Sequence, residues 1–138
     1  MKAIDQKIQN HTAEEPGDCF AACVAMLTGA ALENVPAVGP GESSADYLAR
    51  VGVFLSTLGL HLIGWTVADN GYPYVGAVAL GITDDYWIGS GMYGGTPHAV
   101  VYCGDLMWHD PHRFRMGLDT VASVYRVAPL DPSMWVRK

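Results

Sequence analysis

The spacing of hydrophobic and polar residues changes near the middle of the chain. Between residues 44 and 59 the apolar residues recur at intervals of three and four, which predicts an amphipathic helix that begins at Ser43 or Ser44. From Leu60 onward the apolar residues form shorter runs bounded by turn residues, which is typical of strands. The pattern therefore predicts helices first and strands afterwards, an α+β order without an internal repeat or a linker.

Several segments of the second half are predicted as strands. They are expected at 60–67, 75–80, 99–102, 106–109 and 121–127, with a turn at 69–71. The stretch 81–97 is rich in glycine and aromatic residues, and we expect a loop there that flanks a short segment around 86–88.

A short apolar segment near the N-terminus predicts a further helix with a cysteine in its first turn. Asp18 is expected to cap a helix over 19–27, and Gly29 suits the left-handed residue that follows a helix. Free backbone N–H groups and the helix dipole favour a thiolate in the first turn. The sequence therefore predicts that Cys19 is a reactive thiol.

A predicted hairpin brings two ionisable side chains together. His98 opens the first strand of this hairpin and Asp110 closes the second. A three-residue loop at 103–105 would place His98 opposite Asp110, whereas a two-residue loop at 104–105 would put His109 on the His98 face. The hairpin thus offers His98 an orienting partner in either register. Asp110 is the better partner, because a carboxylate fixes the tautomer of an imidazole and stabilises the imidazolium.

Five short motifs, in their order along the chain, resemble a known family. They are Gln9, Gly17-Asp18-Cys19-Phe20, Glu33-Asn34-Val35-Pro36, His98-Ala99-Val100-Val101 and His109-Asp110-Pro111-His112. The family consists of small bacterial and phage proteins with a papain-like fold, similar to the bacteriocin-leader peptidase domains of ABC exporters. The resemblance runs from about Gln9 to Leu118. It implies that Cys19 is the nucleophile, His98 the general base, Asp110 the orienting residue and Gln9 the oxyanion-hole donor.

The resemblance also implies a fold and an activity. We expect one α+β domain over residues 1–138, with a papain-like fold in which the N-terminal nucleophile helix packs on a small antiparallel sheet. The implied function is that of a thiol hydrolase, a cysteine peptidase or amidase that attacks a peptide or protein substrate through a thioester. The alternatives are an acyltransferase with the same triad and a non-catalytic papain-like binding module, for instance a phage protein that acts on a host factor.

Two motifs suggest other chemistry. Imidazole and carboxylate groups suit zinc, but His109 and Asp110 are adjacent on a strand and point to opposite faces. A zinc site built from Cys19, His98 and Asp110 stays an alternative, although we expect no metal. The glycines of 89–94 match a dinucleotide-binding pattern by letter, yet a strand follows them instead of a helix. We therefore expect no cofactor, and we interpret the loop 89–95 as one wall of the cleft beside His98.

Composition and charge limit the kinds of binding partner that we expect for this chain. A formal net charge of −6 over 138 residues leaves no basic patch for nucleic acid and favours a basic substrate near the cleft. No apolar run approaches a membrane span, and Met1 to Gln9 lack the apolar core of a signal peptide. The three cysteines give no paired spacing, so we expect a reducing cytoplasm and structural roles for Cys23 and Cys103. The oligomeric state stays open.

Overall fold

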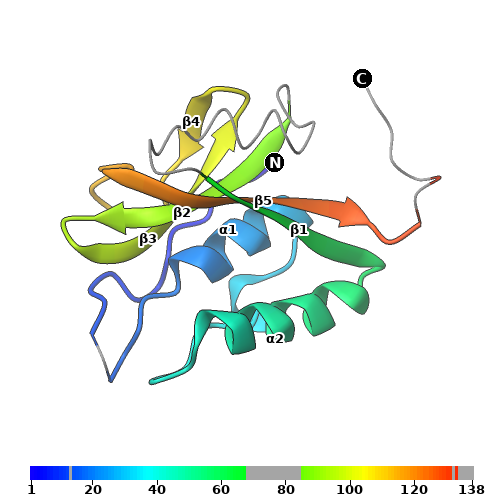
Figure 1. Cartoon of the computed structure of the whole chain (residues 1–138), viewed down its shortest axis with the longest axis horizontal. Coiled ribbons are helices and arrows are strands. Elements are labelled where there is room, and N and C mark those ends of the chain that lie inside the picture. The colour runs from blue at the N-terminus through cyan, green and yellow to red at the C-terminus, as the bar shows by residue number, and fades with distance from the viewer. Residues whose placement is uncertain (13, 68–84, 132, 134–138) are drawn as a thin grey trace.

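The computed structural model describes residues 1–12, 14–67, 85–131 and 133, and it has the predicted α+β order in this part of the chain (Figure 1). The elements are α1 (Cys19–Thr28), a 3₁₀ turn η1 (Leu32–Asn34), α2 (Ser44–Ser56), β1 (Leu60–Thr66), β2 (Tyr86–Tyr93), β3 (Thr96–Cys103), β4 (Leu106–His109) and β5 (Thr120–Pro129). The turn expected at 69–71 and the strand expected at 75–80 lie outside the described residues.

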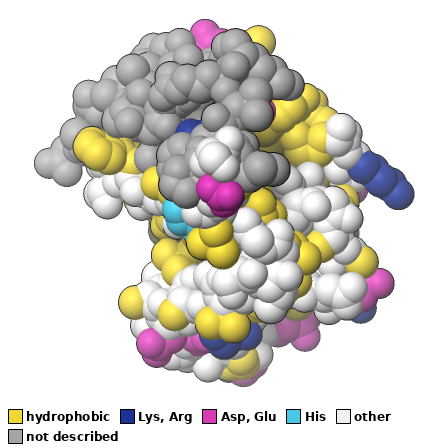
Figure 2. Space-filling view, turned by 90° about the vertical axis from the view of Figure 1, so that its right-hand side faces the viewer, with side chains coloured by type: hydrophobic (Ala, Val, Ile, Leu, Met, Phe, Trp, Pro, Cys, Tyr) yellow, Lys and Arg dark blue, Asp and Glu magenta, His cyan; other side chains and the backbone are white. Residues whose placement is uncertain are grey.

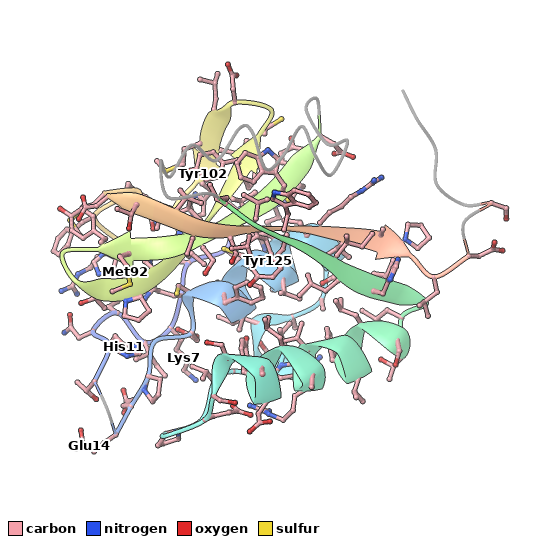
Figure 3. All side chains as sticks on the ribbon, in the orientation of Figure 1. Lys7, His11, Glu14, Met92, Tyr102 and Tyr125 are labelled. Carbon is pink, nitrogen blue, oxygen red and sulfur yellow. The ribbon has the colours of Figure 1, made fainter. Side chains whose placement is uncertain are left out.

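The strands form one antiparallel sheet in the order β1-β5-β2-β3-β4, and both α-helices lie on the same face of it (Figure 1). Successive residues of a strand point to opposite faces, so Ile88 packs in the main core beneath α1 while Trp87 belongs to a second cluster. Side chains in Figure 3 show the same division, because Tyr125 points toward α1 and Tyr102 lies on the other side of the sheet.

Helix α1 begins at Cys19, but its first turn is not capped as the sequence predicted. Asp18 occupies the N-cap position, yet its side chain makes no capping hydrogen bond. Its carboxylate instead accepts hydrogen bonds from the backbone N–H groups of Lys7 and Ile8, at 3.1 and 2.8 Å. Asp18 therefore ties the N-terminal segment to the start of α1. The predicted end of the helix is confirmed, since Gly29 adopts the left-handed conformation with φ 76°.

The start of helix α2 follows the prediction closely. Ser43 is the N-cap, and its hydroxyl accepts a hydrogen bond of 3.1 Å from the backbone N–H of Asp46. The helix ends at Ser56, and Gly59, with φ 73°, completes the turn that leads into β1. The apolar stripe of α2 buries Val51 and Leu55 against the sheet.

The described part of the glycine-rich stretch is mostly strand, so the expected loop is wrong for residues 89–93 and 96–97. The wall expected at 89–95 is strand over residues 89–93, although Ser90 and Tyr93 do line the pockets beside His98. Two of its glycines are needed because other groups approach the backbone of β2 closely. A Cβ atom on Gly89 would lie 2.6 Å from the ring of Tyr102, and one on Gly91 would lie 1.9 Å from the carbonyl oxygen of Thr120. The glycines therefore permit close packing between strands, a use that their spacing does not reveal.

The β3–β4 hairpin starts in the two-residue register and then departs from both registers considered above. Cys103 pairs with Leu106 across a two-residue turn, so the three-residue loop is wrong. A bulge then shifts the register by one residue, so that Val101 pairs with His109. As a result Asp110 reaches His98 despite the short turn, and His109 contacts Asp5 instead.

Candidate active site

The structure brings Cys19, His98 and Asp110 together, from the start of α1, from β3 and from the segment after β4. Cys19 is half-buried at the first residue of α1, where its backbone N–H has no partner within the helix. Cys23 lies one turn further on and is fully buried. Burial, helped by the negative charges of Cys19 and Asp110, raises the pKa of the Cys23 thiol, so Cys23 is a packing residue.

His98 is held by a short hydrogen bond to a buried carboxylate. Its Nε2 lies 2.7 Å from Oδ1 of Asp110, whose side chain is inaccessible to solvent. Asp110 also accepts hydrogen bonds from the backbone N–H groups of His112, at 2.8 Å, and Gly117, at 2.7 Å. The three donors leave the carboxylate no freedom to turn. Since Nε2 faces Asp110, Nδ1 is the ring nitrogen of His98 that is left for other groups, and Cys19 lines the same pockets as His98.

The surroundings of His98 favour its charged form. Burial alone would lower the pKa of His98, but hydrogen bonds to Asp110 and Cys19 and the negative charges of both raise it to about 9. Burial likewise opposes ionisation of Asp110, but the hydrogen bonds from His98 and from the Gly117 and His112 amides lower the pKa of this carboxyl. The geometry therefore suits an imidazolium between a carboxylate and a thiolate.

The raised pKa of His98 predicts a pH-dependent stability. Below about pH 6.5 the imidazole is protonated in both the folded and the unfolded chain, so the stabilisation is fully present there. It is lost as the pH rises from about 6.5 to about 9, and the loss amounts to about 3 kcal/mol of unfolding free energy. Urea unfolding at pH 6 and pH 9.5 measures it. The variant His98→Gln is the control, and an equal decrease in both proteins would contradict the assignment.

The N-terminal segment crosses this site without regular secondary structure. Its backbone is tied down where the N–H of Gln6 donates to the carbonyl of Pro111 at 3.0 Å. Asp5 makes an ion pair of 2.7 Å with Arg115, whose guanidinium also donates to the carbonyl oxygens of Asp110 and His112, each at 2.8 Å. Arg115 adopts a left-handed backbone with φ 53°, which is uncommon for a residue other than glycine. The ion pair therefore fixes the N-terminal segment to the loop that begins with Asp110.

Two glutamines of this segment line the pocket beside Cys19. The amide nitrogen of Gln9 donates to the carbonyl of Gln6 at 2.6 Å, and its oxygen accepts the N–H of Arg113 at 2.9 Å. Gln6 is buried, its Nε2 donates to the carbonyl of Ile8 at 2.7 Å, and the same nitrogen lies 3.7 Å from where a Cβ atom of Gly17 would be. Each of the two amide nitrogens donates one hydrogen bond and keeps one hydrogen free, but that of Gln6 lies closer to the start of α1. Gln6 is thus a second donor candidate, which the sequence analysis missed because nothing in the sequence separates Gln6 from Gln9.

Two pockets of about 250 Å³ each meet at Cys19 and His98. The polar pocket holds Gln6, Gln9, Asn10, His11, Thr96 and His112. The apolar pocket holds Phe20, Val38, Tyr47, Leu48, Ala99 and Tyr125. His11 lines both, and Figure 3 shows it on the N-terminal segment, near the end of the β2–β3 hairpin that carries Met92. A substrate bound at Cys19 would therefore have one polar and one apolar side available.

Other kinds of site find little support in the described part of the chain. No three His, Cys, Asp or Glu side chains of the described residues are arranged to hold a metal ion. None of the described helices is long and apolar enough to cross a bilayer. The face in Figure 2 carries scattered lysine and arginine side chains, interspersed with acidic ones, and no continuous basic surface among the coloured atoms.

Comparisons with protein-family models, with curated proteins and with solved structures found no match to this chain. The residues around Cys19 and their chemistry are therefore the basis on which a function can be inferred.

Proposed function

We propose that this protein is a thiol hydrolase of papain-like fold that cleaves an amide bond of a peptide or protein. The observation that carries the proposal is that Cys19, at the start of α1, and His98 line the same pockets, and that His98 is bonded to the buried Asp110, 2.7 Å from its ring. A helix start and a protonated histidine both stabilise a thiolate. An inert packing cysteine requires neither.

The residues suffice for a complete reaction. The Cys19 thiolate attacks the carbonyl carbon, a C–S bond forms, and the oxyanion is stabilised by the Cys19 backbone N–H and a glutamine amide. When the oxyanion collapses the C–N bond breaks, and the His98 imidazolium gives its proton to the leaving amine. Water then attacks the thioester while neutral His98 accepts a proton from it. The products are a carboxylic acid and the thiolate–imidazolium pair.

A peptide library tests this proposal without knowledge of the natural substrate. The protein is incubated with proteome-derived peptides in H₂¹⁸O, and new C-termini are identified by mass spectrometry. We expect new C-termini that carry ¹⁸O with the native protein and none with Cys19→Ala. The same termini from both proteins, or no cleavage by the native protein, would contradict a hydrolase. Amide products formed with an added amine, in place of ¹⁸O-labelled acids, would indicate an acyltransferase.

The two glutamines are expected to differ in their effect on turnover. Because the Gln6 amide nitrogen is buried beside Gly17, two residues before Cys19, we expect Gln6→Ala to lower kcat by about 100-fold, the usual effect of removing one oxyanion donor. Gln9→Ala should lower kcat by less than about tenfold, because the Gln9 amide is bonded to backbone groups at both ends. The measurement is kcat for a peptide cleaved in the library. The reverse order would assign the oxyanion contact to Gln9, as the sequence resemblance implies.

A further inference from the structure

The polar pocket has an unusual lining for so acidic a chain. The sequence holds 14 acidic and 8 basic residues, yet among the described residues no Asp, Glu, Lys or Arg lines this pocket. Its polar groups are amides, a threonine, a tyrosine, histidines and the Cys19 thiol. A negatively charged group could therefore enter the pocket without meeting a carboxylate, although the net charge of the chain favours a basic substrate.

Two histidines of the polar pocket are fixed as hydrogen-bond donors. The backbone N–H of Gly17 donates to Nδ1 of His11 at 3.0 Å, and the N–H of Phe114 donates to Nδ1 of His112 at 3.2 Å. A ring nitrogen that accepts a hydrogen bond carries no proton, so in each neutral ring the proton is on Nε2. Within the described residues, neither Nε2 has a hydrogen-bond partner. Both rings therefore offer an unused N–H donor.

His112 lies beside the candidate proton donor. Its ring packs edge-on against His98 with the ring centres 6.1 Å apart, and its backbone N–H donates to Asp110. Because His98 must deliver a proton to the leaving amine, the leaving half of a substrate would lie next to His112. His11 lines the same pocket and also borders the apolar pocket, at the junction where Cys19 lies.

We propose that the polar pocket binds a carboxylate on the leaving half of the substrate, and that His11 and His112 hold it through their Nε2–H groups. This inference rests on the proposed function, because the thiol chemistry decides which half of the substrate is the leaving half and lies next to His112. Hydrogen bonds to an ionised group are shorter and stronger than neutral ones, and the nearby His98 imidazolium adds a favourable charge. The substrate class that fits is a peptide cleaved close to its C-terminus, where the leaving amine is an amino acid or a short peptide with a free α-carboxylate.

A matched pair of thiol-reactive probes tests this without a natural substrate. Bromoacetyl-glycine and bromoacetyl-glycinamide both form a thioether with release of bromide, and they differ only in the terminal carboxylate. Rate constants at Cys19 and Cys103 are measured by peptide mapping, with Cys103 as the internal reference for intrinsic reactivity. At each cysteine the rate constant of the carboxylate probe is divided by that of the amide probe. We expect this ratio to be roughly tenfold higher at Cys19 than at Cys103. Bromoacetyl-aspartic acid amide carries its carboxylate on the side chain and so distinguishes a side-chain carboxylate from a C-terminal α-carboxylate. It should react with Cys19 more slowly than bromoacetyl-glycine does.

Paired variants separate the two histidines from the general attraction of His98. Asparagine retains an oxygen near the place of Nδ1 and deletes the Nε2 donor, whereas glutamine places an amide nitrogen near Nε2. We expect His11→Asn and His112→Asn to reduce the preference of Cys19 for the carboxylate probe, and the Gln variants to retain most of it. Thermal unfolding checks that each variant is folded. A preference that is absent, or that both Asn variants leave unchanged, would overturn this inference. The proposed hydrolase would fail separately, in the peptide library.

Discussion

Replacing Asp110 with alanine is expected to lower the free energy of unfolding by about 3–5 kcal/mol, the usual cost of removing one member of a buried charged pair. The residue is 1% exposed, and its carboxylate accepts three hydrogen bonds. Without it, the His98 ring and the amides of His112 and Gly117 are left without their acceptor. Turnover should decrease by about 10³–10⁴-fold, since an imidazole without its carboxylate loses the required tautomer and orientation.

Urea unfolding and an NMR titration of His98 measure the two parts of this prediction. The pKa of His98 should decrease from about 9 toward its ordinary value of 6.5, because burial still lowers it and the hydrogen bond and charge of Asp110 no longer raise it. Asp105→Ala is a matched control, because Asp105 is exposed in the turn of the neighbouring hairpin, and it should change stability by less than about 0.5 kcal/mol. An Asp110→Ala protein as stable as Asp105→Ala, or with an unchanged His98 pKa, would contradict the assigned role.

The second large loss of stability is expected when Gly91 in β2 is replaced with alanine. An alanine Cβ would lie 1.9 Å from the carbonyl oxygen of Thr120 and 2.9 Å from the Cα of Val121, both backbone atoms of β5 or its start. The pairing of β2 with β5 shifts register between Ser90 and Gly91, so the backbone already departs from regular strand pairing there. Gly91→Ala must separate the two strands, and we expect a loss of more than about 3 kcal/mol.

A glycine in open space provides the control for this substitution. Gly52 lies within α2, and a Cβ atom there would meet nothing within 4 Å. Gly52→Ala should stabilise the protein by about 0.5–1 kcal/mol, because glycine is a poor helix former. Both variants are compared with the native protein by urea unfolding. Similar stabilities for the two variants would contradict the close approach of β5 to β2.

The fold could be predicted from the sequence where one periodicity extends over many residues. The stripe of α2 and the cap at Ser43 fixed both the type and the start of that helix, because a local hydrogen bond sets it. The hairpin strands β3 and β4 followed equally well from their apolar runs and the Gly104-Asp105 turn. Local signals therefore predicted local structure.

Long-range contacts explain the predictions that were wrong. Asp18 has the residue type of a helix cap, yet the N–H groups of Lys7 and Ile8, ten residues or more away in sequence, bind its carboxylate. Glycine in β2 is needed because Tyr102 and Thr120 lie against it, and neither is near it in sequence. Tertiary packing overrides local preference in both cases.

The candidate site likewise contains residues that the sequence predicts and residues that it does not. Cys19, His98 and Asp110 were selected from the sequence because each stands at the end of a predictable element, and the structure places them next to one another. Gln6 and His11 belong to a segment without periodic structure, whose path depends on Asp18, Pro111 and Gly17. No spacing rule predicts such a path, so these residues emerged only from the structure.

The most direct test of the thiolate–imidazolium pair is the rate at which iodoacetamide alkylates each cysteine at pH 7, with sites assigned by mass spectrometry. In the native protein we expect Cys19 to react roughly tenfold or more faster than Cys103, because a thiolate is the reactive form. In His98→Ala this selectivity should be lost while Cys103 reacts as before. If Cys19 reacts no faster than Cys103, or equally fast with and without His98, the pair is not formed and the hydrolase account is wrong.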